Sequence, residues 1–216
     1  MSNLNPHLKS HIVELDGGYK LVHHPLVITT YNDHDFVIND INSMYQRKKE
    51  MLKQAKRDHN FFEYVFLHER PYRVRIFHSE VLEWDISKQD FWWLFKDVWL
   101  DSENIFENKI LWHSLLKTHR DEPQLMMNED ERETLESMPD KLTIYRGGID
   151  DKGFSWTLNK DTAKWFANKW IMNGNLGNES NVTKRHNTDV FEREINKVDV
   201  LAYLDDRNEE EILYIP

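Results

Sequence analysis

The sequence of 216 residues contains no cysteine, which excludes disulfide bonds, thiol catalysis and zinc bound through cysteine. It also lacks an apolar run of about eighteen residues and a charged-then-apolar leader at its N-terminus. The eleven histidines give no ligand set that we assign to a metal. There is neither an internal repeat nor a low-complexity linker. From these absences we expect a cytoplasmic protein without a membrane segment and without a bound metal.

Positive charge is also in short supply, with 28 Lys and Arg against 38 Asp and Glu and a net charge of −10. A broad interface with a phosphate backbone is therefore not indicated, and a nucleic-acid partner would require a local basic groove. Hydrophobic residues make up 39% of the chain and include eight tryptophans, which suffices for a core. The length suits one domain, or one domain with an appendage.

One stretch, residues 142–170, combines two short strands with a helix. Its first strand is rich in β-branched and aromatic residues, and we expect it to stop at Gly147 and Gly148. Arg146 then lies at a strand end. The helix should begin after Asn159, a residue that often caps helices. Its apolar stripe has i, i+3, i+4, i+7 spacing and consists of Ala163, Phe166, Ala167 and Trp170.

Polar side chains alternate with aromatic ones in the second strand, residues 154–157. Ser155 and Thr157 share one face of this strand, and Phe154 and Trp156 share the other. One face can therefore belong to the core while the opposite face holds a polar ligand.

Three consecutive glutamates precede the last strand of the sequence. A strand is expected at 199–204, followed by a polar turn, the glutamates and a final strand at 212–215. Adjacent carboxylates repel one another and do not favour folding, which indicates a functional role. In an extended chain Glu209 and Glu211 project to one face and Glu210 to the other.

Three motifs occur in this order: Tyr145-Arg146-Gly147, Phe154-Ser155-Trp156-Thr157 and Arg207-Asn208-Glu209-Glu210-Glu211-Ile212. The sequence here resembles the ADP-ribosyltransferase superfamily, in the branch with an Arg, a Ser-x-Ser/Thr and a Glu-x-Glu motif. It is particularly similar to small ADP-ribosyltransferase-like proteins of bacteriophages, over about residues 91–216. The resemblance implies an α+β fold with two small packed β-sheets, flanking helices and an N-terminal hairpin-plus-helix extension.

The same resemblance implies an NAD-dependent mono-ADP-ribosyltransferase, a glycosyltransferase that uses NAD as co-substrate and modifies a host protein or another macromolecule. Cleavage of the nicotinamide–ribose bond builds oxocarbenium-like charge on the ribose, which a carboxylate stabilises. The family pattern gives this role to Glu211 and the orientation of the acceptor to Glu209. Arg146 would bind the pyrophosphate, and Ser155 and Thr157 would steady the ribose or the carboxylate. The residues expected to contact NAD are Tyr145, Arg146, Gly147, Ser155, Trp156, Thr157 and Phe166.

Two other functions stay open on the sequence. One is a catalytically silent protein of the same fold that acts as an acidic binding protein or inhibitor. The other is an NAD glycohydrolase, which uses the same site with water as the acceptor. The register of the glutamates is open as well, because Glu210 would replace Glu211 if the strand shifted by one residue.

The N-terminal region, residues 1–86, is expected to pack on a catalytic region at 87–216. It begins with a hairpin whose strands flank Asp16, Gly17 and Gly18. Since the sequence ends at Pro216, any strand that closes the catalytic sheet should come from this region. The remaining predictions are a helix at 40–56, mixed strand and loop at 61–77, helices at 87–100, 102–116 and 128–138, a long loop at 173–188 and a strand at 190–195.

Overall fold

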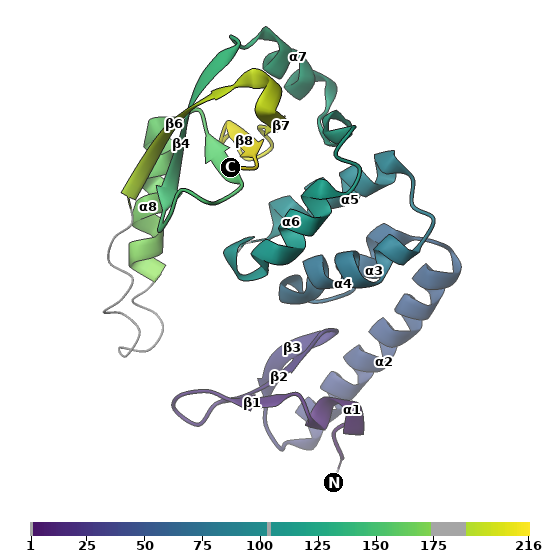
Figure 1. The fold of residues 1–216 in the computed structure, drawn as a ribbon. Coiled ribbons are helices and arrows are strands. Elements are labelled where there is room, and N and C mark those ends of the chain that lie inside the picture. Colours follow the sequence, from purple (N-terminus) through teal and green to yellow (C-terminus); the bar gives the residue numbers. More distant parts are fainter. Residues whose placement is uncertain (1, 103–104, 174–188) are drawn as a thin grey trace. The chain divides into compact units, whose positions relative to one another are not determined.

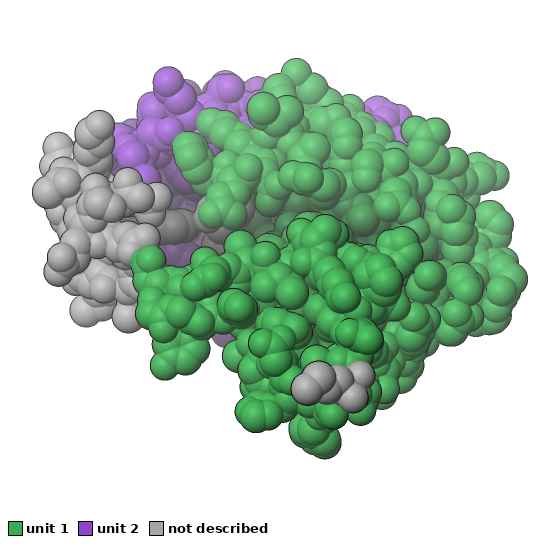
Figure 2. Space-filling model, turned by 90° about the horizontal axis from the view of Figure 1, so that it is seen from below, with its two compact units in different colours: residues 1–118 green, residues 119–216 purple. Residues whose placement is uncertain are grey.

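The computed structural model describes residues 2–102, 105–173 and 189–216, without the side chains of 169–173. Of the predicted loop at 173–188, all but residue 173 lie outside the described residues. The side chain of Trp170 lies outside them as well. The protein is α+β, with two small antiparallel sheets. Its contacts form two compact units, 1–118 and 119–216, which Figure 2 colours separately. The boundary expected at 86–87 lies inside the first unit.

The first sheet is a three-stranded meander of β1 (Ile12–Glu14), β2 (Lys20–His24) and β3 (Val27–Tyr31). Between β1 and β2, Gly17 and Gly18 have φ of 85° and 79°, the left-handed region that glycine adopts without strain. This confirms the predicted turn. The second arm of the hairpin is divided at Pro25, because proline has no N–H for the sheet ladder.

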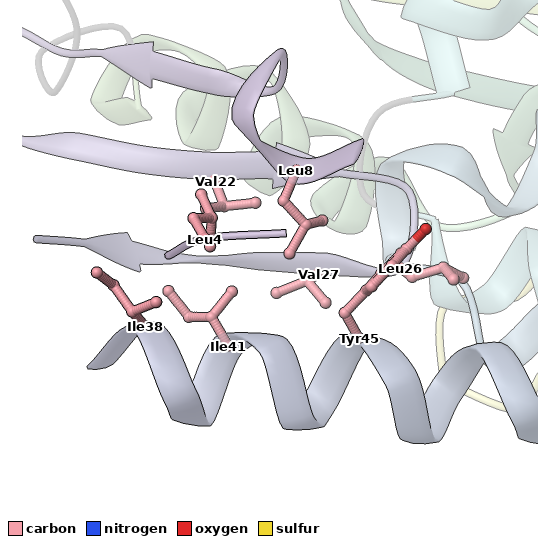
Figure 3. Close-up of a cluster of buried hydrophobic side chains, with 8 residues drawn as sticks. All are labelled: Leu4, Leu8, Val22, Leu26, Val27, Ile38, Ile41 and Tyr45. Carbon is pink, nitrogen blue, oxygen red and sulfur yellow. The ribbon is translucent and has the colours of Figure 1, made fainter. Parts of the chain in front are cut away.

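This sheet buries its apolar side chains against two helices of the same unit, α1 (Pro6–Lys9) and α2 (Asp35–Arg57). Figure 3 shows the cluster, which contains Leu4, Leu8, Val22, Leu26, Val27, Ile38, Ile41 and Tyr45. Helix α2 begins at Asp35 rather than at the predicted Asp40 because Ile38 and Ile41 extend its apolar stripe towards the N-terminus. The hairpin therefore finds a core within its own unit.

Residues 61–77 are helical, which corrects the prediction of mixed strand and loop. They form α3 (Phe61–Phe66), the 3₁₀ turn η1 (Arg70–Tyr72) and most of α4 (Arg73–Ser79), and the 3₁₀ turn η2 (Val81–Glu83) follows. The side chain of Asn60 caps α3 by accepting the Glu63 N–H. Pro71 lies in the first turn of η1, where its missing N–H costs nothing.

An aromatic core joins α4 to α5 (Lys88–Asp101) and α6 (Lys109–Lys117), and the 3₁₀ turn η3 (Ile105–Asn108) precedes α6. The helix predicted at 87–100 is confirmed as α5, and the side chain of Ser87 caps it. The helix expected at 102–116 is instead split into η3 and α6. The core rings are fully or almost fully buried and stack or meet edge-to-face: Phe77, Phe91, Trp92, Phe95, Trp99 and Trp112.

The second unit contains a five-stranded sheet with the order β6-β4-β5-β8-β7. Its elements are the 3₁₀ turn η4 (Pro123–Met126), α7 (Glu129–Ser137), β4 (Lys141–Gly148), β5 (Ser155–Thr157), α8 (Lys160–Asn173), β6 (Asp189–Asn196), the 3₁₀ turn η6 (Lys197–Asp199), β7 (Val200–Leu204) and β8 (Glu211–Tyr214). The last strand, β8, pairs with β5 on one side and β7 on the other. Figure 1 shows β7 and β8 beside each other near the C-terminus. The expected closing strand from the N-terminal region is therefore wrong, since β7 supplies it.

The strand register aligns one residue from each of four neighbouring strands. Tyr145 of β4 pairs with Thr157 of β5, Thr157 pairs with Glu211 of β8, and Glu211 pairs with Leu204 of β7. Directly paired residues share a face of an antiparallel sheet, so this row brings all three motifs of the sequence together. Strand β4 continues to Gly148, so the glycine pair lies within the strand and does not end it.

None of the helices in the described ranges is long and apolar enough to cross a bilayer.

Candidate functional site

A hydrogen bond between Ser155 and Glu211 lies at the centre of the second unit's polar cluster. The Ser155 hydroxyl donates to Oε1 of Glu211 over 2.5 Å. Glu211 is only 3% exposed, although it is the first residue of β8. A buried carboxylate is stable only when its charge is paired or hydrogen-bonded, so this contact determines where the side chain points. The structure thus joins Ser155 to Glu211 and not to Glu210.

Arg207 binds the same carboxylate from the opposite oxygen. Its Nη2 lies 3.1 Å from Oε2 of Glu211 and 3.0 Å from Oε2 of Glu209. Side-chain exposure falls from 37% for Arg207 through 23% for Glu209 to 4% for Glu211. The three groups therefore lead from the surface of the unit into its interior, and both oxygens of Glu211 have a donor.

Arg146 connects β4 to the beginning of β5. Its Nη1 donates to the main-chain oxygen of Ser155 over 2.7 Å, and its Nε donates to that of Asp150 over 3.2 Å. Burial lowers the pKa of Arg146, whereas the charges of Asp150 and Glu211 act in the opposite direction. A guanidinium keeps its proton at neutral pH even so. Arg146 is thus a fixed cation whose field reaches Glu211.

Gly153 makes room for this arginine. An ideal Cβ at Gly153 would lie 2.0 Å from Cζ of Arg146, so any other residue at this position would displace the guanidinium. The loop between β4 and β5 is also held by Trp156, whose indole N–H donates to the Gly153 oxygen over 2.9 Å, and by an ion pair of 2.7 Å between Arg193 and Asp151. The position of Arg146 therefore depends on the conformation of the whole loop.

Thr157 holds the main chain of the glutamate segment. Its hydroxyl donates to the Glu209 oxygen over 2.7 Å and accepts the Asn159 N–H over 3.0 Å. The Leu158 N–H donates to the Glu210 oxygen over 3.1 Å. The Thr157 side chain is 5% exposed, so its observed contacts are internal and differ from the expected contact with a ribose or a carboxylate.

The segment before β8 is a turn, although the sequence predicts extended chain at the glutamates. Asn208 and Glu210 have φ of 53° and 47°, in the left-handed region. Oδ1 of Asp205 accepts the Glu210 N–H over 3.2 Å. Strand alternation is thus the wrong reason for grouping Glu209 with Glu211. The turn and their common contact with Arg207 bring them together.

Glu131 anchors this turn to α7. Its Oε1 accepts the Asp205 N–H over 3.1 Å, while its Oε2 accepts the Asn128 N–H over 2.8 Å in a capping box. Glu210 belongs to a different environment from Glu211. Burial raises the pKa of Tyr203, and the negative charges of Asp205, Glu210 and Glu131 raise it further.

Two of the residues expected to contact NAD, Gly147 and Trp156, take part in the packing of the second unit. An ideal Cβ at Gly147 would lie 1.8 Å from the Ala163 oxygen, so this position must be glycine for α8 to pack on β4. Trp156 is 2% exposed, and the guanidinium of Arg193 lies 5.2 Å from its ring centroid. Trp156 pairs with Ile212, which is fully buried, and so belongs to the core.

Two other expected contacts, Tyr145 and Phe166, are half-buried. The Lys160 ammonium lies 5.1 Å from the centroid of the Tyr145 ring. Phe166 meets Trp165 edge-to-face at 4.9 Å. Tyr145 belongs to the row that contains Glu211, whereas Phe166 comes from α8.

The structure therefore gathers Arg146, Ser155, Glu209 and Glu211 in one polar network. Sequence reasoning missed the role of Arg207, for which the only signal was its position four residues before Glu211. It predicted the helix at 128–138 but gave Glu131, in the first turn of that helix, no part in the site.

Comparisons with protein-family models, curated proteins and solved structures gave no match. Within the described ranges, no group of three or more His, Cys, Asp or Glu side chains could hold a metal ion.

Proposed function

We propose that the second unit carries the active site of an NAD-dependent mono-ADP-ribosyltransferase that modifies a macromolecule. The observation that carries this proposal is the contact between Ser155 and Glu211, with Arg146 bonded to the same serine. Three residues from motifs up to 65 positions apart (146 to 211) form a single network, in the order that the resemblance requires. A fold has no need of a buried carboxylate at this position, because a hydrophobic pair would serve stability as well.

The geometry suits stabilisation of positive charge on a ribose. Glu211 is held by two donors before any substrate arrives, so little reorganisation is needed when oxocarbenium-like charge develops nearby. Ser155 donates to Glu211 and keeps lone pairs that can accept a bond from a ribose hydroxyl. Arg146 uses two of its five N–H donors on main-chain oxygens, and the others suit a pyrophosphate.

The reaction would proceed by exchange at C1′ of the nicotinamide ribose. The glycosidic bond breaks, and its electron pair leaves with nicotinamide. A nucleophilic atom of the acceptor forms the new bond to C1′ and loses its proton to Glu209, which is more exposed than Glu211 and can reach an acceptor.

A second candidate function is binding without catalysis. It is favoured by the ion pair with Arg207, because both oxygens of Glu211 already have a donor and a ribose hydroxyl would have to share or displace one. The NAD glycohydrolase alternative uses the same residues, with water in place of the acceptor.

Replacement of Glu211 by Gln tests the proposal. Glu211→Gln keeps the shape of the side chain but removes its charge, so nicotinamide release and transfer should both fall by about 10²–10³. Both are measured with NAD labelled on nicotinamide and on adenine, in the presence of cell lysate. A suitable control is Glu194→Gln, since Glu194 is 61% exposed in an ion pair with Lys141 on the same sheet.

The outcomes separate the three functions. Nicotinamide release with labelling of an acceptor supports the transferase, and release without any labelled acceptor indicates the glycohydrolase. No release from the wild-type protein would leave binding alone.

A further inference from the structure

We propose that Arg207 is a positioning residue that holds the side chain of Glu209 beside that of Glu211, so that one cation organises both carboxylates of the site. This inference rests on the proposed function of the same site, and it gives a role to Arg207, whereas the resemblance assigns roles only to Glu209 and Glu211 in that motif. Its basis is the pair of contacts from one nitrogen, 3.0 Å to Glu209 and 3.1 Å to Glu211.

Two carboxylates that reach the same nitrogen lie within about 6 Å of each other and repel. A cation between them offsets this repulsion and fixes the direction of each side chain. Arg146 does not take this place, because its hydrogen bonds go to the main-chain oxygens of Ser155 and Asp150.

The two glutamates are not held equally. Glu211 is part of β8, is almost fully buried and also accepts the Ser155 hydroxyl. Glu209 precedes the strand, in the turn that includes the left-handed residues Asn208 and Glu210, and is more exposed. Loss of the Arg207 charge should therefore displace Glu209 first and leave Glu211 in place.

This asymmetry predicts a difference between the two partial reactions. Transfer requires both Glu209 and Glu211, whereas nicotinamide release to water requires Glu211 but not Glu209. In Arg207→Gln, the kcat of transfer should fall by about tenfold or more, as expected for loss of a hydrogen bond to a charged group. NAD hydrolysis should fall by a clearly smaller factor than transfer, because Glu211 loses one of its two donors but keeps the Ser155 hydroxyl.

Arg207→Lys separates positioning by charge from a general contribution to the fold. Lysine restores a cation that can contact both carboxylates, so transfer should recover most of its rate. Lys141→Gln is the matched control, because Lys141 forms an exposed ion pair elsewhere on the same sheet. An equal fall of transfer and hydrolysis in Arg207→Gln, or equal behaviour of the Gln and Lys variants, would overturn the inference.

A second measurement needs neither NAD nor an acceptor. Urea unfolding of Arg207→Gln, Glu209→Gln and the double variant forms a cycle that reports the coupling between the two side chains. The unfolding equilibrium constant of the double variant should differ by at least about twofold from the value expected if the two single substitutions acted independently. Additive effects overturn the inference whatever the NAD assays show.

This cycle also keeps the two proposals apart. If the wild-type protein releases no nicotinamide, the proposed function fails, and the coupling alone decides whether Arg207 holds Glu209.

Discussion

Arg146 is a cation whose partners are mainly uncharged. Two main-chain oxygens accept from it, burial lowers its pKa, and Asp150 and Glu211 only partly oppose that effect. A lysine at this position would have one compact donor group in place of a planar fork, and desolvation would favour its neutral form. A substitution that keeps the formal charge is therefore not conservative at this position.

We predict that Arg146→Lys weakens NAD binding nearly as much as Arg146→Ala, by about 1.5–3 kcal/mol, because a charge-assisted bond and its geometry are both lost. Titration calorimetry measures the change. Lys152→Ala, in the exposed part of the same loop, should bind like wild type. Unchanged affinity in both Arg146 variants would remove this residue from the binding site.

Among the structural elements, α7 supports the turn at residues 205–210, the glutamate turn, through one buried side chain. Glu131 is 4% exposed and accepts from the main chain of both Asn128 and Asp205. Its contact with Asp205 links α7 to the end of β7, so a side chain of the α7 capping box also holds the turn that follows β7.

Glu131→Ala should lower the free energy of unfolding by about 1–2 kcal/mol, because it leaves the main-chain N–H groups of Asn128 and Asp205 without their acceptor. Urea denaturation gives the value. Glu129→Ala, at an exposed position in the first turn of the same helix, should cost less than about 0.5 kcal/mol. Equal losses in the two variants would show that the helix N-terminus, and not the link to the turn, is responsible.

Elements with a strong local signal could be predicted from the sequence. Three helices begin where expected, after residues 87, 128 and 159, and the side chains of Ser87, Asn128 and Asn159 cap them. In residues 61–77, aromatic and charged residues alternate, which suggests strand and loop, whereas the cap at Asn60 and a proline in a first turn are the signals of the observed helices. Strand order could not be predicted, because the pairing of β8 between β5 and β7 depends on contacts between distant segments.

The candidate site shows the same division. The Ser155 and Thr157 alternation predicts that both share a face, and their pairing opposite Leu213 and Glu211 confirms it. The left-handed φ of Glu210 has no signature in a run of three glutamates. The turn and the contact with Arg207 could therefore not be predicted from the sequence.

At the scale of the whole molecule, a group of histidines makes the stability of the first unit dependent on pH. Burial, together with the nearby His11, His68 and His7, lowers the pKa of His24 from 6.5 to about 4. Its Nδ1 accepts the Leu26 N–H over 3.0 Å, which requires this nitrogen to be unprotonated. The folded protein therefore resists a proton that the unfolded chain accepts.

The free energy of unfolding should fall as the pH drops from about 6.5 towards 4, because the unfolded state binds more protons across this interval. With allowance for partial exposure, His24 should contribute about 1–2 kcal/mol. Urea unfolding at several pH values measures the slope, which His24→Asn should reduce and His34→Asn, at an exposed position, should not. A slope that is unchanged in His24→Asn would assign the effect to other groups.

The edge strand β7 has an unusual hydrogen bond with a consequence for chemical ageing. The Tyr203 N–H donates to the sulfur of Met127 over 3.2 Å, and Met127 is 5% exposed. Peroxide converts a thioether to a sulfoxide only where it can reach the sulfur, so oxidation of Met127 must wait for this edge to open. In a chain without cysteine, no thiol competes for the oxidant. The rate of Met127 sulfoxide formation should therefore report how often the edge of the sheet next to the glutamate turn opens.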